Sequence, residues 1–205
     1  MIDPLTLAAF VPAALALNLT PGADMLFCLG QGLRGGPRAA LAADAGIALG
    51  CMVQVGLAGL GLAALTVAHP GAFEAMRWAG VAYLLWLALQ VLRHPPGAGA
   101  VPATSARRAF LQGLVVNLLN PKVILFVLAL LPQYVDPARP VLPQFLVLGL
   151  ILSLGGLLVN GLVGVNAGSL GQRLARSPRI GRWLGRATAT IFVALAAKLA
   201  LTQKG

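Results

Sequence analysis

Charged side chains are scarce in this chain, and acidic ones are the scarcest. Only five Asp and Glu residues occur among 205, charged residues make up 10% of the chain, and hydrophobic residues make up 59%. With a mean hydropathy of +0.87, a soluble globule of this size would expose large apolar patches. The scarcity of charge therefore excludes a soluble domain and places the chain in a lipid bilayer.

Histidine and cysteine are equally rare, with two residues of each type. Cys28 and Cys51 belong to no CxxC pair and to no Cys/His cluster of metal-ligand spacing. The sequence also contains no GxxxxGK(S/T) phosphate loop and no HExxH motif. We therefore expect no enzyme activity, no catalytic residue, no metal site and no cofactor, so that an ion or substrate gradient has to supply the energy for any transport.

What the chain has in excess is basic residues, which give it a formal net charge of +10. A nucleic-acid-binding protein gathers its Lys and Arg on an otherwise polar face. Here the arginines fall between apolar runs. We interpret them as topology signals and expect no nucleic-acid partner.

Six apolar runs are long enough to cross a bilayer, which takes roughly 20 residues each. The predicted spans lie near residues 5 to 33, 40 to 66, 72 to 92, 108 to 131, 142 to 166 and 183 to 202. This pattern predicts an all-α integral membrane protein. A Pro/Gly-rich linker over residues 95–106 separates a first unit, 1–94, from a second unit, 107–205.

The two units resemble each other in sequence. Pro21 recurs as Pro121 at an offset of 100, and three glycines recur at an offset of 105: Gly50, Gly56 and Gly59 return as Gly155, Gly161 and Gly164. A repeat of three spans is odd-numbered, so its second copy has to enter the membrane from the opposite face. The sequence therefore predicts six transmembrane helices arranged as two inverted three-helix repeats.

Loop charges predict the orientation. Ten loop arginines fall on the side of the linker, against three Lys and Arg residues on the other side. Because cytoplasmic loops carry the excess of Lys and Arg, both termini are expected outside the cytoplasm. The proline in the first span leaves one alternative open, a re-entrant segment that would reverse the amino terminus.

Two proline-broken segments interrupt the first and fourth predicted spans. Proline removes a helical hydrogen bond, so the broken backbone presents free polar groups that only a protein-lined or watery cavity can satisfy. Paired breaks in corresponding halves indicate a substrate site. The candidate substrate-binding residues are Asn18, Thr20, Pro21, Gly22 and Asp24 at the first break and Asn117, Asn120, Pro121 and Lys122 at the second.

Asp24 and Lys122 lie at similar depth, since each closely follows its proline. They could form a structural ion pair, or they could bind the ammonium and the carboxylate of a zwitterion. Asp24 and Asp44 are also candidates for proton coupling, although Asp44 could instead pair with a loop arginine such as Arg38. The mid-span polar residues Gln54, Ser153 and Asn160 are expected to hydrogen-bond between helices.

These motifs resemble those of the lysine exporter (LysE) superfamily, in its homoserine/threonine resistance (RhtB-like) branch. Thr20 to Asp24 is similar to an early Thr-Pro-Gly-Pro-(Asp/Asn) motif, with Ala23 in place of the second proline. Gly80 to Leu84 is similar to a Gly-x-x-Tyr-Leu element, and Asn117 to Lys122 to an Asn-x-x-Asn-Pro-Lys element. The resemblance covers almost the whole chain.

The resemblance implies a secondary active exporter of amino acids in the bacterial inner membrane, driven by the proton-motive force. Small neutral substrates such as homoserine, threonine or leucine are expected, and a homodimer is a further expectation. A metal-cation exporter of the same superfamily is the first alternative, which would call for more Asp, Glu or His inside the spans. A membrane-embedded enzyme or a non-catalytic assembly subunit is the second.

Overall fold

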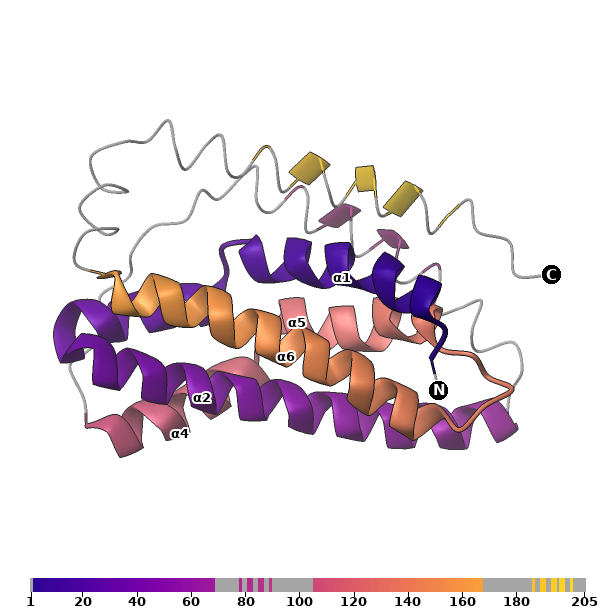
Figure 1. The fold of residues 1–205 in the computed structure, drawn as a ribbon, viewed down its shortest axis with the longest axis horizontal. Coiled ribbons are helices and arrows are strands. Elements are labelled where there is room, and N and C mark those ends of the chain that lie inside the picture. Colours follow the sequence, from indigo (N-terminus) through magenta and orange to yellow (C-terminus); the bar gives the residue numbers. More distant parts are fainter. Residues whose placement is uncertain are drawn as a thin grey trace.

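Helices joined by short loops make up the described part of the chain, and no strand occurs there (Figure 1). The computed structural model describes residues 2–68 and 105–167, with single positions between 78 and 89 and between 186 and 200. The elements are α1 (Pro4–Leu19), α2 (Ala23–Ala68), α4 (Ala106–Leu118), α5 (Pro121–Leu125), a π-helical turn η1 (Phe126–Leu130), a 3-10 turn η2 (Leu131–Tyr134) and α6 (Val141–Val165). The predicted all-α class is confirmed.

The element α2 is two helices joined at Gly36, whose φ of +70° is a left-handed value that glycine tolerates without strain. Pro37 follows directly. The two helices fold back on each other, because Gly164 of α6 lies against both the Cys28 carbonyl and the Ala40 side chain. Gly36 is therefore the turn of a helical hairpin, seen at the left of Figure 1.

By length and composition, two described helices can cross a bilayer, α2 and α6, and the bent pair of α4 with residues 122–134 counts as a third. The helix α1 has 16 residues, fewer than a crossing needs by itself. These helices occupy the first, second, fourth and fifth predicted spans. Only single positions of the third and sixth spans are described, and most of the linker lies outside the described residues, so six spans stay a prediction.

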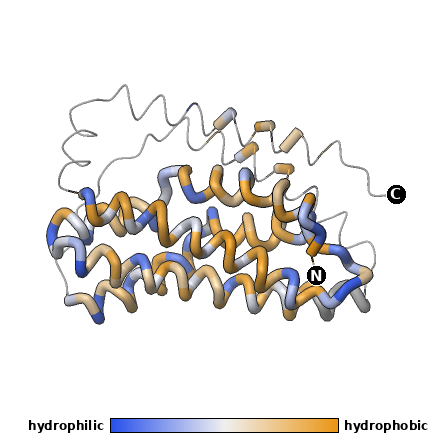
Figure 2. The backbone as a smooth tube through the Cα atoms, viewed as in Figure 1, coloured by the Kyte–Doolittle hydropathy of each residue, from blue (hydrophilic) through white to orange (hydrophobic). Residues whose placement is uncertain are grey.

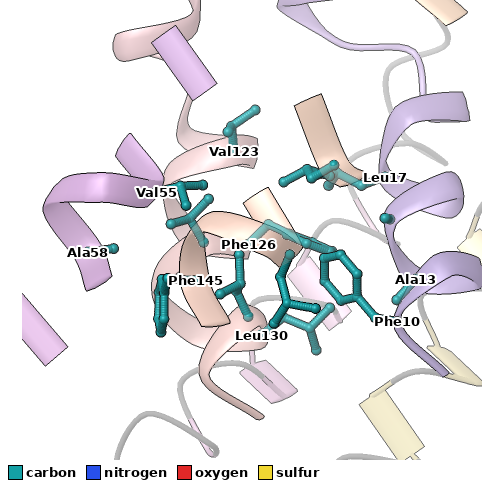
Figure 3. Close-up of a cluster of buried hydrophobic side chains, with 14 of the residues drawn as sticks. Phe10, Ala13, Leu17, Val55, Ala58, Val123, Phe126, Leu130 and Phe145 are labelled. Atoms are coloured by element: carbon teal, nitrogen blue, oxygen red, sulfur yellow. The ribbon is translucent and has the colours of Figure 1, made fainter. Parts of the chain in front are cut away.

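Hydrophobic residues dominate the lengths of the helices, and many of the hydrophilic ones lie near the helix ends (Figure 2). Inside, α1, α2, η1 and α6 share one core (Figure 3). Phe10 of α1 packs its ring 6.3 Å from that of Phe126 and meets Tyr134 edge-on at 5.1 Å. Lipid is as apolar as this core, so the hydrophobic effect does not drive the helices together in a bilayer. Close packing of the side chains holds them instead.

Glycines bring α2 and α4 into backbone contact. A Cβ atom on Gly46 would collide with the Phe110 carbonyl, and one on Gly113 would collide with the Ala43 carbonyl. Each helix thus presents a glycine to the backbone of the other, as expected from the small-residue spacing around Gly46. The contact fixes α4 against the beginning of the second helix of α2, which follows Gly36 and is called the long α2 helix below.

Contacts between α2 and α6 repeat at the offset found in the sequence. Gly59 packs against Phe145, and their counterparts 105 residues away, Gly164 and Ala40, pack against each other. The Ser153 hydroxyl donates to the Ala48 carbonyl at 3.1 Å, across a separation of 105 residues. The contact positions of α2 and α6 therefore correspond at an offset of 105 residues, while the side chains at these positions differ.

Candidate functional site

The first break separates α1 from α2 at Thr20, Pro21 and Gly22. Thr20 is extended, with φ −70° and ψ 119°, and its hydroxyl donates to the Ala16 carbonyl at 2.6 Å. Pro21 has no N–H with which to continue the ladder. The Thr20 N–H makes the last bonds of α1, to the Ala16 and Leu17 carbonyls, and the helical ladder ends there.

The second break separates α4 from α5 at Leu119 and Asn120. The Asn120 side chain caps the new helix, because its Oδ1 accepts from the Lys122 backbone N–H at 3.0 Å. Pro121 occupies the first helical position, where its missing N–H costs nothing. The sequence element Asn-Pro-Lys thus starts a new helix through its N-cap and its proline, and it is also part of the candidate site.

Lys122 links the second break to the first. Its Nζ donates to the Leu17 carbonyl at 3.0 Å and to the Thr20 carbonyl at 2.9 Å. A cation is favoured there because the carboxyl end of α1 carries a partial negative charge. Gly22 leaves room for it, since a Cβ on Gly22 would lie only 3.1 Å from the Lys122 Nζ.

Asp24 makes the reverse link, from the first break to the second. Asn117, the last buried residue of α4, donates from Nδ2 to Asp24 Oδ2 at 3.0 Å. Gln54 of α2 supports Asn117 by donating to its backbone carbonyl at 2.7 Å. Asp24 Oδ1 is buried with no hydrogen-bond partner in the described part of the chain.

Asp24 and Lys122 therefore bind opposite breaks, and no ion pair joins them among the described residues. Each break is held by a side chain that belongs to the other. The two charges still lie near enough to interact, so the structural pair and the zwitterion site both stay hypotheses. The arrangement leaves Asp24 Oδ1 without a hydrogen-bond partner in the described part, while the Lys122 ammonium bonds two backbone carbonyls of the first break.

Asn18 occupies a position similar to that of Asn117. Its Nδ2 donates to the Leu152 carbonyl at 3.1 Å, and a Cβ on Gly155 would lie 2.7 Å from that Nδ2. Asn117 likewise lies over Gly50, the counterpart of Gly155 in the repeat. Both asparagines thus join a broken helix to the continuous helix of the other unit.

A cavity of about 30 Å³ lies between these groups. Its polar lining comes from both breaks and from α6: Asn18, Asp24, Asn117, Ser153 and Asn160. The space suits one water molecule, whose share of liquid volume is about 30 Å³. An amino acid fits only if the helices move apart.

Asp44 lies deeper in the helix bundle than its place near a loop suggests. Its side chain is 1% exposed, and neither carboxylate oxygen has a hydrogen-bond partner in the described part. It faces α6, where a Cβ on Gly161 would lie 3.0 Å from its Oδ2. Arg38 is exposed, and no ion pair of Asp44 occurs among the described residues.

Two glutamines belong to this polar interior and were not among the predicted site residues. The interhelical bonds expected of Gln54 and Ser153 are confirmed. Gln31 is fully buried, with neither side-chain polar atom bonded in the described part. Helical spacing could have indicated its burial. Gln31 follows Asp24 by seven residues, which is two helical turns, so both side chains lie on the same face of the helix.

No group of three or more His, Cys, Asp or Glu side chains that could hold a metal ion occurs among the described residues. The candidate site is therefore built from one carboxylate, one ammonium, amides and backbone carbonyls. Such groups can bind a zwitterion.

Comparison with known proteins identifies the family. The LysE type translocator model matches residues 15–203. A homoserine/homoserine lactone efflux protein of Salmonella typhimurium is 34% identical over 201 residues, which cover 94% of each chain. A leucine efflux protein of Enterobacter is 29% identical over 199 residues, or 93% of each chain.

A cysteine/O-acetylserine efflux protein of Shigella flexneri is also 29% identical over 199 residues, covering 97% of this chain and 99% of the relative. No solved structure matches the chain. The match makes the protein a transmembrane translocator rather than an enzyme, and the resemblance drawn from the motifs is confirmed. The chain belongs to the LysE family of translocators.

Proposed function

We propose that this protein is a secondary exporter of amino acids whose substrate binds between the two helix breaks. Its relatives are named for the efflux of homoserine, leucine and cysteine, which favours small neutral amino acids as substrates. The observation that carries the proposal is the reciprocal bonding of the breaks, with Lys122 on the carbonyls of the first and Asp24 on the amide of Asn117.

The chemistry of the two ends suits a zwitterion. Asp24 Oδ1 can accept from a substrate ammonium without losing the bond that Oδ2 accepts. The Lys122 ammonium has three N–H donors, of which two carbonyls take two, so one remains for a substrate carboxylate. Asn18, Thr20, Gly22 and Asn120 shape the backbone around these groups, and the two prolines keep the breaks open.

The small cavity supports alternating access. At about 30 Å³ it is too small for an amino acid, and among the described residues that line it Asp24 is the charged one, so binding has to separate the two broken helices. The contacts that repeat at an offset of 105 residues favour two inverted repeats that move against each other. Six spans, with units 1–94 and 107–205 around the linker, complete this proposal.

The ends of the described helices support an orientation in the bacterial inner membrane. Arg34 and Arg38 flank the turn at Gly36, and Arg107 and Arg108 open α4, whose start lies beside the start of the long α2 helix. All four arginines are exposed. By the positive-inside rule this end faces the cytoplasm, which leaves both termini outside.

Proton coupling is assigned to Asp44 and Asp24. Ionisable groups that face the interior of a membrane protein often belong to proton relays. Asp44 is 1% exposed, its two oxygens have no hydrogen-bond partner in the described part, and Asn160 is a polar side chain close to it. A homodimer remains part of the proposal, since six helices form a thin wall around a cavity.

Purified protein in proteoliposomes tests the function. Vesicles loaded with one radiolabelled amino acid each, from a panel of homoserine, threonine, leucine, cysteine and lysine, receive an imposed pH gradient. We expect efflux of small neutral amino acids that collapses when a protonophore removes the gradient. If every amino acid of the panel leaves protein-free liposomes as fast as it leaves liposomes that contain the protein, export is refuted.

A further inference from the structure

A second cavity lies beside the site, and nothing so far has given it a role. Its volume is about 370 Å³. The second helix of α2 lines one side, with Ala58 and Gly61, and the turns η1 and η2 line the other, with Val127 and Pro132. Phe145, in the second turn of α6, also lines the cavity, and Figure 3 draws it near Ala58.

The cavity leads to the charged groups through one residue, Gln54. Gln54 is part of the cavity lining, and its Nε2 donates to the Asn117 carbonyl. Asn117 in turn bonds Asp24 and lines the small cavity. Gln54 Oε1 is buried with no partner in the described part, so an unbonded acceptor belongs to a residue that lines the large cavity and bonds Asn117.

The repeat shows what the cavity corresponds to in the other half of the molecule. At offsets of 100 and 105, Pro132 and Leu62 correspond to Gly32 and Ala167. Pro132 and Leu62 both line the large cavity. Gly32, by contrast, packs so closely that a Cβ on it would meet the Gly164 carbonyl and lie 2.7 Å from the Ala167 Cβ. The positions Gly32 and Ala167 are thus in contact in one half. The equivalent positions in the other half, Pro132 and Leu62, both face the large cavity.

The segments that follow the two breaks differ in the same sense. Residues 23–35 after the first break are regular helix. The equivalent residues after the second break change from α-helix to a π turn, Phe126–Leu130, and then to a 3-10 turn, Leu131–Tyr134. Such departures inside a helix often mark functional sites. Two equivalent segments therefore hold two conformations in one structure.

We propose that the large cavity is the outer half of the transport path and receives the side chain of an exported amino acid with an uncharged aliphatic side chain, such as leucine. The packed contact of Gly32 with α6 is its closed counterpart on the cytoplasmic side. The proposal rests on the proposed function and names the substrate class for that site. No ionised side chain occurs among the described residues that line the cavity, so these residues offer no counter-charge to a buried lysine-like side chain.

Gly61 allows the cavity to be filled without disturbing the fold. A Cβ on Gly61 meets nothing within 4 Å, and Gly61 is part of the lining. Gly56, on the same helix, has equally open space but lies outside the lining, between the exposed Val53 and Leu60. Gly61→Phe and Gly56→Phe are therefore a matched pair, since both remove a helical glycine.

The first experiment measures leucine and lysine efflux from proteoliposomes. We expect wild type to prefer leucine, Gly61→Phe to slow leucine efflux about tenfold or more, equivalent to ~1.4 kcal/mol, and Gly56→Phe to match wild type. Wild-type leucine efflux by Gly61→Phe overturns the cavity assignment while export stands, and preferred export of lysine overturns the substrate class. If wild type exports none of the panel, the proposed function fails and this assignment fails with it.

The second experiment asks whether water or lipid fills the cavity. Gly61→Cys in a bilayer should react with a membrane-impermeant maleimide added from outside, and leucine should slow the reaction where lysine does not. Gly56→Cys, at a position outside the lining, should not react. Native Cys28 and Cys51 are buried and are replaced in both variants. An unreactive Gly61→Cys would show an acyl-chain groove and overturn the proposal.

Discussion

Replacing Lys122 by methionine removes the ammonium that joins the two breaks and keeps most of the side-chain volume. The Leu17 carbonyl still accepts from the Thr20 N–H at 3.2 Å, whereas the Thr20 carbonyl loses the donor that reaches it at 2.9 Å. The first break is then left with an unpaired carbonyl facing the interior. Asp24 is left without a cation in its neighbourhood.

The size of the effect follows from the two bonds that are lost. Hydrogen bonds to charged groups contribute about 1.5 to 3 kcal/mol each, so two of them give roughly 3 to 6 kcal/mol. Burying the ammonium costs part of this, and removing one member of a buried charged set usually destabilises by about 3 to 5 kcal/mol. We expect a loss of ~3 kcal/mol and a fall in melting temperature on the order of 10 °C.

Thermal unfolding in detergent and efflux from proteoliposomes, measured on the same preparations, separate structure from transport. Arg139→Met is the matched control, because it removes a basic residue from an exposed ion pair with Asp136 that is worth about 0 to 1 kcal/mol. Lys122→Arg should recover part of the stability but little transport, since a planar guanidinium places its donors differently from a compact ammonium.

Two results would contradict this reasoning. If Lys122→Met melts at the wild-type temperature, the hydrogen bonds from Lys122 to the first break do not contribute to the stability of the protein. If it melts lower and still exports at the wild-type rate, Lys122 is a structural cap, and a substrate carboxylate has to bind elsewhere.

Three more predictions follow from the same contacts. Asp44→Asn should export down a substrate gradient but no longer respond to an imposed pH gradient, because its two unbonded oxygens are the proposed proton acceptors; an unchanged pH response would exclude that role. Gly113→Leu should lower the free energy of unfolding by about 1 to 3 kcal/mol, since its side chain would strike the Ala43 carbonyl, whereas Gly56→Leu should not; equal melting temperatures would disprove the close contact of α2 and α4. Cysteines placed at Ala98 and Ala138 should be labelled from opposite faces of the membrane, and labelling from one face would overturn the six-span topology.

The sequence by itself determined the class of the protein and the places where its helices break. Composition alone required a bilayer. The breaks at Pro21 and Pro121 follow from a local cause, a residue without an N–H, and local causes can be read without the fold. The glycine at the α2–α4 contact, Gly46, was likewise apparent from its spacing.

Only the tertiary structure decided which groups meet across the breaks. Similar depth made Asp24 and Lys122 look like partners, but each binds the opposite break, through contacts 93 to 105 residues apart in the chain. Gln31 and Gln54 join the polar interior for the same reason, since burial depends on the packing of other helices. The unequal halves, one packed at Gly32 and one hollow at Gly61, are a property of a conformation, and a sequence repeat specifies the two halves alike.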